Sequence, residues 1–110
     1  MSEERIEIDV FKQVDLQVGT VAEAGKVEGS RKLIRLVVDI GAGRRTVIAG
    51  IGEQYTPEEL QGTQVVLVAN LKPARIMGQE SNGMILAAAD GKKLAVLRPD
   101  RPVKPGCRVS

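Results

Sequence analysis

The sequence has 110 residues, a formal net charge of +2, one cysteine and no histidine. A chain of this length forms one domain without help from metal or disulfide, and the single Cys107 excludes an intramolecular bridge. Without histidine, Ser-His-Asp and Cys-His catalysis and an imidazole zinc site are excluded, so we expect no catalytic residue, metal or cofactor.

The charge is unevenly distributed along the chain. The first nine residues have a net charge of −3, which leaves +5 on the rest, and a modestly basic body is compatible with a polyanionic partner. Only Phe11 and Tyr55 are aromatic, which argues against a platform that stacks several bases. No apolar run is long enough to span a membrane and the start is no signal peptide, so we expect a cytoplasmic protein without a membrane partner.

The N-terminal part predicts a flexible segment, a helical turn and a long strand. Residues 1–8 are polar and expected to be flexible, and a turn N-capped by Asp9 is expected to plug one end of a barrel. Apolar residues then alternate over 16–24, where Gly19 stands at a position that suits a kink in a curved strand.

The middle of the chain predicts a hairpin followed by a short helix. Alternation over 33–40 indicates a half-buried strand, which returns through Gly41-Ala42-Gly43 to a strand over 45–49. Thr56-Pro57-Glu58-Glu59 combines an N-cap threonine, a proline at the first helical position and a capping-box glutamate.

Two apolar runs, 65–69 and 84–89, predict buried strands. Three strands, a short helix and two more strands give an all-β OB-fold, a five-stranded barrel whose face and loops bind oligonucleotides. We therefore predict a domain over 9–110 with the barrel ending at about residue 90. The apolar strand and prolines of 91–110 exceed this barrel, and a second copy of the chain is one place for them to pack.

The stretch 70–86, between the last two barrel strands, carries the chemistry expected of a binding site. It is predicted to be a loop that offers cations for phosphate, hydrogen-bonding groups for a base or ribose, and a soft apolar surface. The alternative is a solvated loop with an ordinary turn and a core methionine. The candidate residues are Lys72, Arg75, Asn70, Gln79, Ser81 and Met84.

The run Asn70-Leu71-Lys72-Pro73-Ala74-Arg75, followed by Gly78, Glu80-Ser81 and Gly83-Met84-Ile85-Leu86, resembles the signature of a known family. This family is the tRNA-binding domain found at the C-terminus of many methionyl-tRNA synthetases and as free-standing structure-specific tRNA-binding proteins. Further matches follow in order from Phe11 onward, among them Asp15-Leu16-Gln17-Val18-Gly19, Gly29-Ser30-Arg31-Lys32-Leu33 and Pro57-Glu58-Glu59-Leu60-Gln61-Gly62.

The resemblance implies an OB-fold homodimer joined through its C-terminal extension, which binds tRNA by shape. It also implies a set of RNA-contacting residues: Lys32, Asn70, Lys72, Arg75, Ser81 and Met84. The sequence departs from the family pattern before Lys32, where Val27-Glu28-Gly29-Ser30-Arg31 replaces a common His-Pro pair and an aspartate. Arg75 is often lysine in relatives. The charge is the same, but an arginine guanidinium can bind a phosphate through two parallel hydrogen bonds, whereas a lysine ammonium acts as a point charge.

Three hypotheses about function remain open at this point. The first is a non-catalytic tRNA-binding module that is appended to or associated with the catalytic portion of methionyl-tRNA synthetase and raises its tRNA affinity. The second is a dimeric OB-fold peptide-binding export chaperone, with Ile76, Met77 and Met84 lining an apolar groove. The third is a generic binder of single strands, for which unstructured oligonucleotides compete as well as folded tRNA does.

Overall fold

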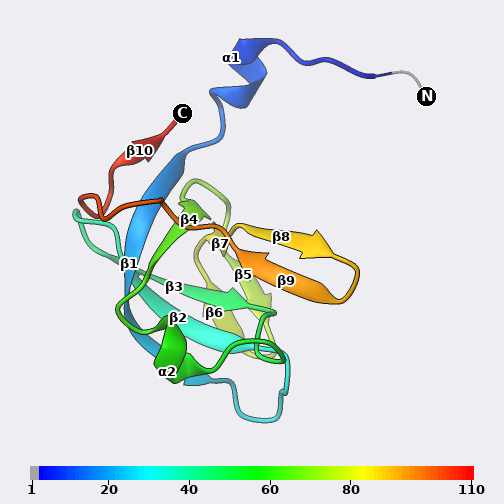
Figure 1. Cartoon of the computed structure of the whole chain (residues 1–110), viewed down its shortest axis with the longest axis vertical. Coiled ribbons are helices and arrows are strands. Elements are labelled where there is room, and N and C mark those ends of the chain that lie inside the picture. Colours follow the sequence, from blue (N-terminus) through cyan, green and yellow to red (C-terminus); the bar gives the residue numbers. More distant parts are fainter. Residues whose placement is uncertain (1–2) are drawn as a thin grey trace.

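An antiparallel sheet curls into a nearly closed five-stranded barrel (Figure 1) in this computed structural model, which describes residues 3–110. The strand order in the barrel is β3-β2-β1-β4-β7. In chain order the elements are α1 (Ile8–Phe11), β1 (Leu16–Lys26), β2 (Ile34–Asp39), β3 (Arg44–Ala49), α2 (Pro57–Leu60), β4 (Gln64–Val68), β5 (Ala74–Ile76), β6 (Gln79–Ser81), β7 (Met84–Ile85), β8 (Ala87–Asp90), β9 (Lys93–Val96) and β10 (Arg108–Val109).

The long strand β1 is shared between two neighbours. Its first half pairs with β4, from Leu16 opposite Val68 to Thr20 opposite Gln64, and its second half pairs with β2. Alternate residues of these strands point inward and form the core, in which the most completely buried side chains are Val21, Ile34, Leu36, Val38, Val47, Leu60, Val65 and Leu67. The all-β, OB-like barrel predicted from the sequence is confirmed.

Gly19 lies where β1 packs closely against β2, and the kink expected there stays a prediction. The irregularity in β1 lies between Val21 and Glu23, where the register against β2 shifts. A Cβ atom at Gly19 would overlap Cγ1 of Val38 and lie 3.2 Å from the carbonyl oxygen of Asp39. Glycine is therefore favoured at this position because a side chain would collide with the buried Val38 of β2.

The short helix α2 forms as its sequence predicts. The Thr56 hydroxyl accepts a hydrogen bond from the Glu59 amide (3.3 Å), and the Glu59 carboxylate accepts one from the Thr56 amide (2.8 Å), which completes the capping box. Pro57 occupies the first turn, and Leu60 is fully buried in the core. This helix covers part of the barrel interior.

The predicted barrel plug at the N-terminus is wrong. Helix α1 is N-capped by Glu7 rather than Asp9, without a side-chain capping bond, and every one of its side chains is exposed. Figure 1 shows α1 standing clear of the barrel. A single turn this far from the sheet has no core to enter. The flexibility expected of residues 1–8 stays a prediction, and residues 1–2 lie outside the described part of the chain.

The C-terminal region returns to the barrel of its own chain. The predicted strand over 84–89 breaks at Leu86 into β7 and β8, and β8 forms a hairpin with β9. Strand β10 pairs with the start of β1, and Val18 exchanges hydrogen bonds with Gly106 (2.6 Å) and Cys107 (2.9 Å). No helix within residues 3–110 is long and apolar enough to cross a membrane.

Candidate nucleic-acid interface

The stretch between β4 and β7, predicted as a loop, contains a two-stranded hairpin. Strands β5 and β6 pair with Arg75 opposite Glu80 and Ile76 opposite Gln79. The two residues of the turn, Met77 (φ 48°) and Gly78 (φ 77°), both have positive φ, which is the geometry of a type I′ turn. Arg75 therefore projects from a defined strand, and its guanidinium donates a hydrogen bond to the Gly78 carbonyl (3.3 Å).

The tip of this hairpin reaches the loop between β1 and β2. A Cβ atom at Gly29 would lie 3.9 Å from the terminal methyl of Met77. The same loop carries Lys32, whose backbone amide donates to the Ser30 hydroxyl (3.2 Å) and whose carbonyl accepts from Gly52 (2.7 Å). The structure thus brings together the β1–β2 and β4–β7 connections, which are the loops that bind nucleic acid in OB-folds.

A groove runs along the barrel surface beside these loops. A pocket of about 350 Å³ is lined by Met84, Ile85, Leu86 and neighbouring residues of β3 and β9. An adjoining pocket of about 540 Å³ contains Lys32 and Lys92, and the two pockets share Gly50, Ile51 and Leu94. Met84 is 48% exposed, so its side chain belongs to the groove and not to the core.

The cations of this surface are not neutralised by carboxylates in the part of the chain that the structure describes. The ion pairs within residues 3–110 are Arg44–Glu23 (3.7 Å) and Arg101–Asp100 (3.6 Å). Lys32, Lys72 and Arg75 are all exposed. These three side chains are therefore free to contact phosphate groups of a bound polyanion.

Ser81 differs from the other candidates because it is buried, with 4% of its surface exposed. Its hydroxyl accepts a hydrogen bond from the Ile48 amide (2.9 Å) and donates one to the Gly83 carbonyl (3.2 Å). The neighbouring Asn82 amide donates to the Thr46 carbonyl (2.7 Å). Ser81 thereby attaches strand β6 of the hairpin to barrel strand β3, and its hydroxyl is not presented to a ligand.

Asn70 has an exposed side chain whose amide is already engaged. Its Oδ1 accepts from the Asp15 amide (2.9 Å), and its Nδ2 donates to the Gln13 carbonyl (2.7 Å). The Ala69 amide adds a third bond to the Asp15 carbonyl (2.8 Å). Asn70 thus connects the start of the β4–β7 connection to the segment that precedes β1.

We expect Ser81→Ala to destabilise the fold by about 1 to 3 kcal/mol, since the buried Ile48 amide loses its acceptor. Urea unfolding followed by circular dichroism measures this loss. Glu80→Ala, at the exposed neighbouring position, is the control and should change stability by less than about 0.5 kcal/mol. Equal stability of the two variants would contradict a structural role for the hydroxyl.

Sequence reasoning missed one residue of this surface, Lys92, which lines the same pocket as Lys32 and the acidic Glu53. Met77, which the sequence suggested only for a peptide-binding groove, lies at the hairpin tip. A lysine in a turn is a common pattern, so only the folded chain places Lys92 here. Within residues 3–110, no group of three or more acidic, cysteine or histidine side chains is arranged to hold a metal ion.

The family described as "Putative tRNA binding domain" matches residues 16–108 of this sequence. The chain belongs to this family. The family resemblance drawn from the motif residues is therefore confirmed, and a tRNA-binding domain of this kind is a non-catalytic binding module.

Curated relatives of this tRNA-binding domain are much longer proteins. This chain is 52% identical over 106 residues to the methionine-tRNA ligase of Archaeoglobus fulgidus, and the match covers 96% of this chain and 16% of that protein. It is 53% identical over 105 residues to the methionine-tRNA ligase of Thermotoga maritima, covering 96% and 17%. The chain thus spans about a sixth of the length of these relatives.

Some of the solved structures similar to this tRNA-binding domain are matched over their whole length. A MetRS-related protein from Pyrococcus horikoshii superposes with a TM-score of 0.93 at 38% identity, covering 98% of this chain and 100% of that one. The chaperone CsaA from Bacillus anthracis superposes with a TM-score of 0.89 at 31% identity, covering 97% and 100%. The fold is therefore shared by a protein named as related to MetRS and by a protein named as a chaperone.

Proposed function

We propose that this domain binds tRNA by shape and acts, in the cytoplasm, as an appended or associated module of methionyl-tRNA synthetase that raises its tRNA affinity. The observation that carries the proposal is the hairpin tip at Met77 lying against the β1–β2 loop. This contact brings the loop of Lys32 beside the hairpin of Arg75, in a chain of the tRNA-binding domain family. The domain would raise the local concentration of tRNA and leave the aminoacylation chemistry to the catalytic portion.

In this proposal the candidate residues have two kinds of role. Lys32, Lys72 and Arg75 contact phosphates, and Met84 offers an apolar surface to an exposed base or ribose. Asn70 and Ser81 act indirectly, because their polar atoms already hold the hairpin and its root in place. Selectivity then rests on the spacing of cations around a rigid groove, which matches a folded RNA better than a flexible strand.

Binding of folded tRNA and of a single-stranded RNA of equal length, at several salt concentrations, tests the proposal. We expect a preference for tRNA and a slope of log K against log salt of about −2 to −5, since each neutralised phosphate contributes roughly 0.7 to 0.9. Fluorescence anisotropy measures both affinities. Equal affinity for both RNAs would favour generic single-strand binding, and a slope near zero would exclude a phosphate-based mechanism.

A second candidate function is peptide binding. It is favoured by the apolar pocket beside Met84 and by the likeness to a protein named as a chaperone. A peptide would use the apolar walls of the groove and not its cations, so its binding should survive reversal of the charges at Lys72 and Arg75. The same variants therefore separate the two functions.

We further propose that the domain is a homodimer and that residues 91–110 contribute to the interface. Much of this extension already has partners in its own chain: Leu94 and Val96 pack on the core and β10 pairs with β1. Truncation of residues 92–110 would therefore remove intrachain structure as well as an interface. Substitutions of exposed residues are the better test.

A further inference from the structure

The hairpin of β8 and β9 lies outside the five-stranded barrel. It forms a two-stranded sheet of its own, in which Ala87 lies opposite Val96 and Asp90 opposite Lys93. Figure 1 shows this hairpin projecting from one side of the barrel. Leu94 and Val96 pack against the core, whereas Lys93 is exposed and all four residues of β8 are exposed as well. Alternate residues of β9 therefore face the barrel, and the others face solvent.

Two neighbouring side chains of the connection between β3 and α2 attach this hairpin to the barrel. The Gln54 side-chain amide donates a hydrogen bond to the Lys92 carbonyl and accepts one from the Leu94 amide (2.8 Å). The Tyr55 hydroxyl accepts a hydrogen bond from the Val96 amide (3.1 Å). The backbone of Lys92 is therefore held in place, although the residue lies in an exposed turn.

The same connection also holds the β1–β2 loop, which carries Lys32. The Gly52 amide donates a hydrogen bond to the Lys32 carbonyl (2.7 Å). A Cβ atom at Gly52 would lie 2.8 Å from the Arg31 carbonyl oxygen, so the two backbones are in close contact here. Gly52 and Gln54 thus attach two turns that are far apart in the sequence to one short segment of the chain. This segment sets the spacing between the backbones of Lys32 and Lys92.

Lys32 and Lys92 line the same pocket of about 540 Å³, together with Glu53. All three side chains are exposed, and neither lysine forms an ion pair within residues 3–110. Two cations and one carboxylate leave the pocket with an excess of positive charge. Two unpaired ammonium groups on backbones of fixed spacing are suited to hold a phosphate group between them.

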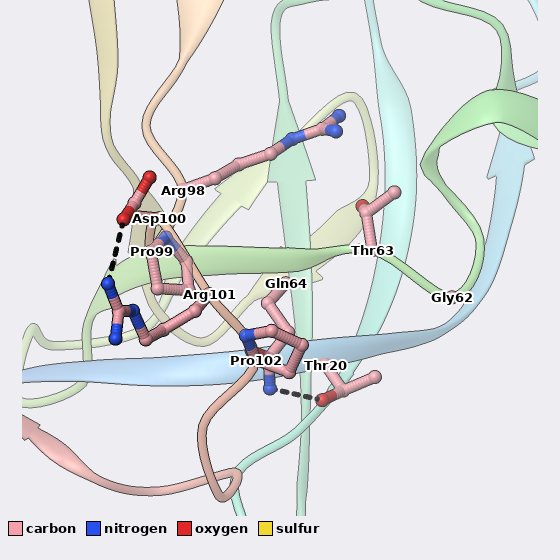
Figure 2. A pocket seen from close by; sticks show the side chains of 9 residues that line it. All are labelled: Thr20, Gly62, Thr63, Gln64, Arg98, Pro99, Asp100, Arg101 and Pro102. Atoms are coloured by element: carbon pink, nitrogen blue, oxygen red, sulfur yellow. Dashed lines mark hydrogen bonds and ion pairs between the residues drawn. The ribbon is translucent and has the colours of Figure 1, made fainter.

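Two other cations near the C-terminus, Arg98 and Arg101, are arranged differently. They line a pocket of about 410 Å³ against β1 and β4 (Figure 2), and this pocket shares no residue with the groove. Figure 2 shows the two side chains extending in different directions, and Arg101 pairs with Asp100 (3.6 Å). These arginines do not converge on one ligand position, whereas Lys92 shares a pocket with Lys32 beside the β1–β2 loop.

We infer that the β8–β9 hairpin forms a second wall of the RNA site, where Lys92 and Lys32 contact a backbone phosphate and Gln54 is the positioning residue that holds Lys92. This assignment rests on the proposed binding of tRNA and extends its contacts beyond the β1–β2 and β4–β7 connections. Glu53 opposes the contact, because its carboxylate repels the phosphate. The rest of the C-terminal extension stays available to the proposed dimer interface.

Charge changes in the pocket test the phosphate contact. Lys92→Glu should weaken tRNA binding by about tenfold and lower the magnitude of the slope of log K against log salt by about one. Glu53→Gln should strengthen binding by about twofold to fivefold, because it removes a repulsion. Lys93→Glu is the matched control: it changes the net charge as Lys92→Glu does, but Lys93 lies outside the pocket, so binding should weaken by less than about threefold. Fluorescence anisotropy over a salt series measures these effects.

A double-mutant cycle tests the positioning role of Gln54. Gln54→Ala should weaken tRNA binding by about threefold in the wild-type chain and have no further effect in the Lys92→Ala chain, where no ammonium group is left to position. A purely structural role would weaken binding equally in both chains. Circular dichroism and sedimentation velocity should show the wild-type fold and mass for every variant.

Four outcomes would each overturn the inference while leaving the proposed function intact, provided that the wild-type chain binds tRNA. They are equal effects of Lys92→Glu and Lys93→Glu, an unchanged salt slope in Lys92→Glu, weaker binding by Glu53→Gln, and additive effects of Gln54→Ala and Lys92→Ala. A changed mass of Lys92→Glu would likewise overturn it, since Lys92 would then act through assembly. Absence of tRNA binding by the wild-type chain would overturn the proposed function and the inference together.

Discussion

Reversing the two cations of the β4–β7 connection with Lys72→Glu/Arg75→Glu is expected to weaken tRNA binding by about a hundredfold or more. Both side chains are exposed and without carboxylate partners in residues 3–110, so each substitution removes a phosphate contact and adds a repulsion. The slope of log K against log salt should fall in magnitude by about one for each lost contact. Fluorescence anisotropy over a salt series measures both quantities.

Arg44→Glu is the control for the single Arg75→Glu variant, because it makes the same change in net charge. Arg44 begins β3 at the β2–β3 turn, whereas the β1–β2 loop meets the hairpin tip near the other end of β2. It should weaken tRNA binding by less than about threefold, through long-range electrostatics alone. Equal effects of Arg44→Glu and Arg75→Glu would show that net charge, and not the groove, determines affinity.

Gly106→Ala is expected to have the largest effect on stability, with a loss of about 3 kcal/mol or more. Gly106 has a φ of +89°, and a Cβ atom there would overlap the Ile40 carbonyl oxygen. The backbone must then move, and the bond from the Gly106 amide to the Val18 carbonyl (2.6 Å) is lost with it. Urea unfolding measures the change in the free energy of unfolding.

Gly91→Ala separates the two causes of this loss. Gly91 also has a positive φ, +61°, but nothing lies within 4 Å of a Cβ atom at this position. It should therefore lose only about 1 to 2 kcal/mol, the penalty of the left-handed backbone. If Gly106→Ala were no more destabilising than Gly91→Ala, the close approach of Gly106 to the β2–β3 turn would not matter for stability.

The barrel and its capping helix were predictable because their signals are local. Thr56 and Glu59 satisfy each other across three residues, and alternating apolar residues define the inward face of each strand without knowledge of its neighbour. The motif around Lys72 and Arg75 likewise identifies the family from sequence alone. Both cations lie on the surface as that motif implies, and their contacts with RNA remain a proposal.

The roles of Asn70 and Ser81 were decided only by the tertiary structure. The backbone groups that they bind lie 57 and 33 residues away in the sequence, at Gln13 and Ile48. A polar residue in a motif looks the same in the sequence whether its side chain faces a ligand or binds a distant backbone group. Sequence spacing therefore cannot distinguish direct contact from support of the site.

The N-terminal segment, residues 3–14, shows the same division between local and long-range information. Its acidic and apolar residues are evident in the sequence, but the apolar pattern around α1 equally suited a plug for the barrel. Only the fold shows that α1 reaches no core and that β10 occupies the edge of β1. Sequence by itself determined the succession of barrel strands and helix along the chain, the capped helix and the family, because these depend on neighbours in the chain. Tertiary structure decided which polar and apolar groups remain unpartnered, because that depends on contacts between residues far apart in the sequence.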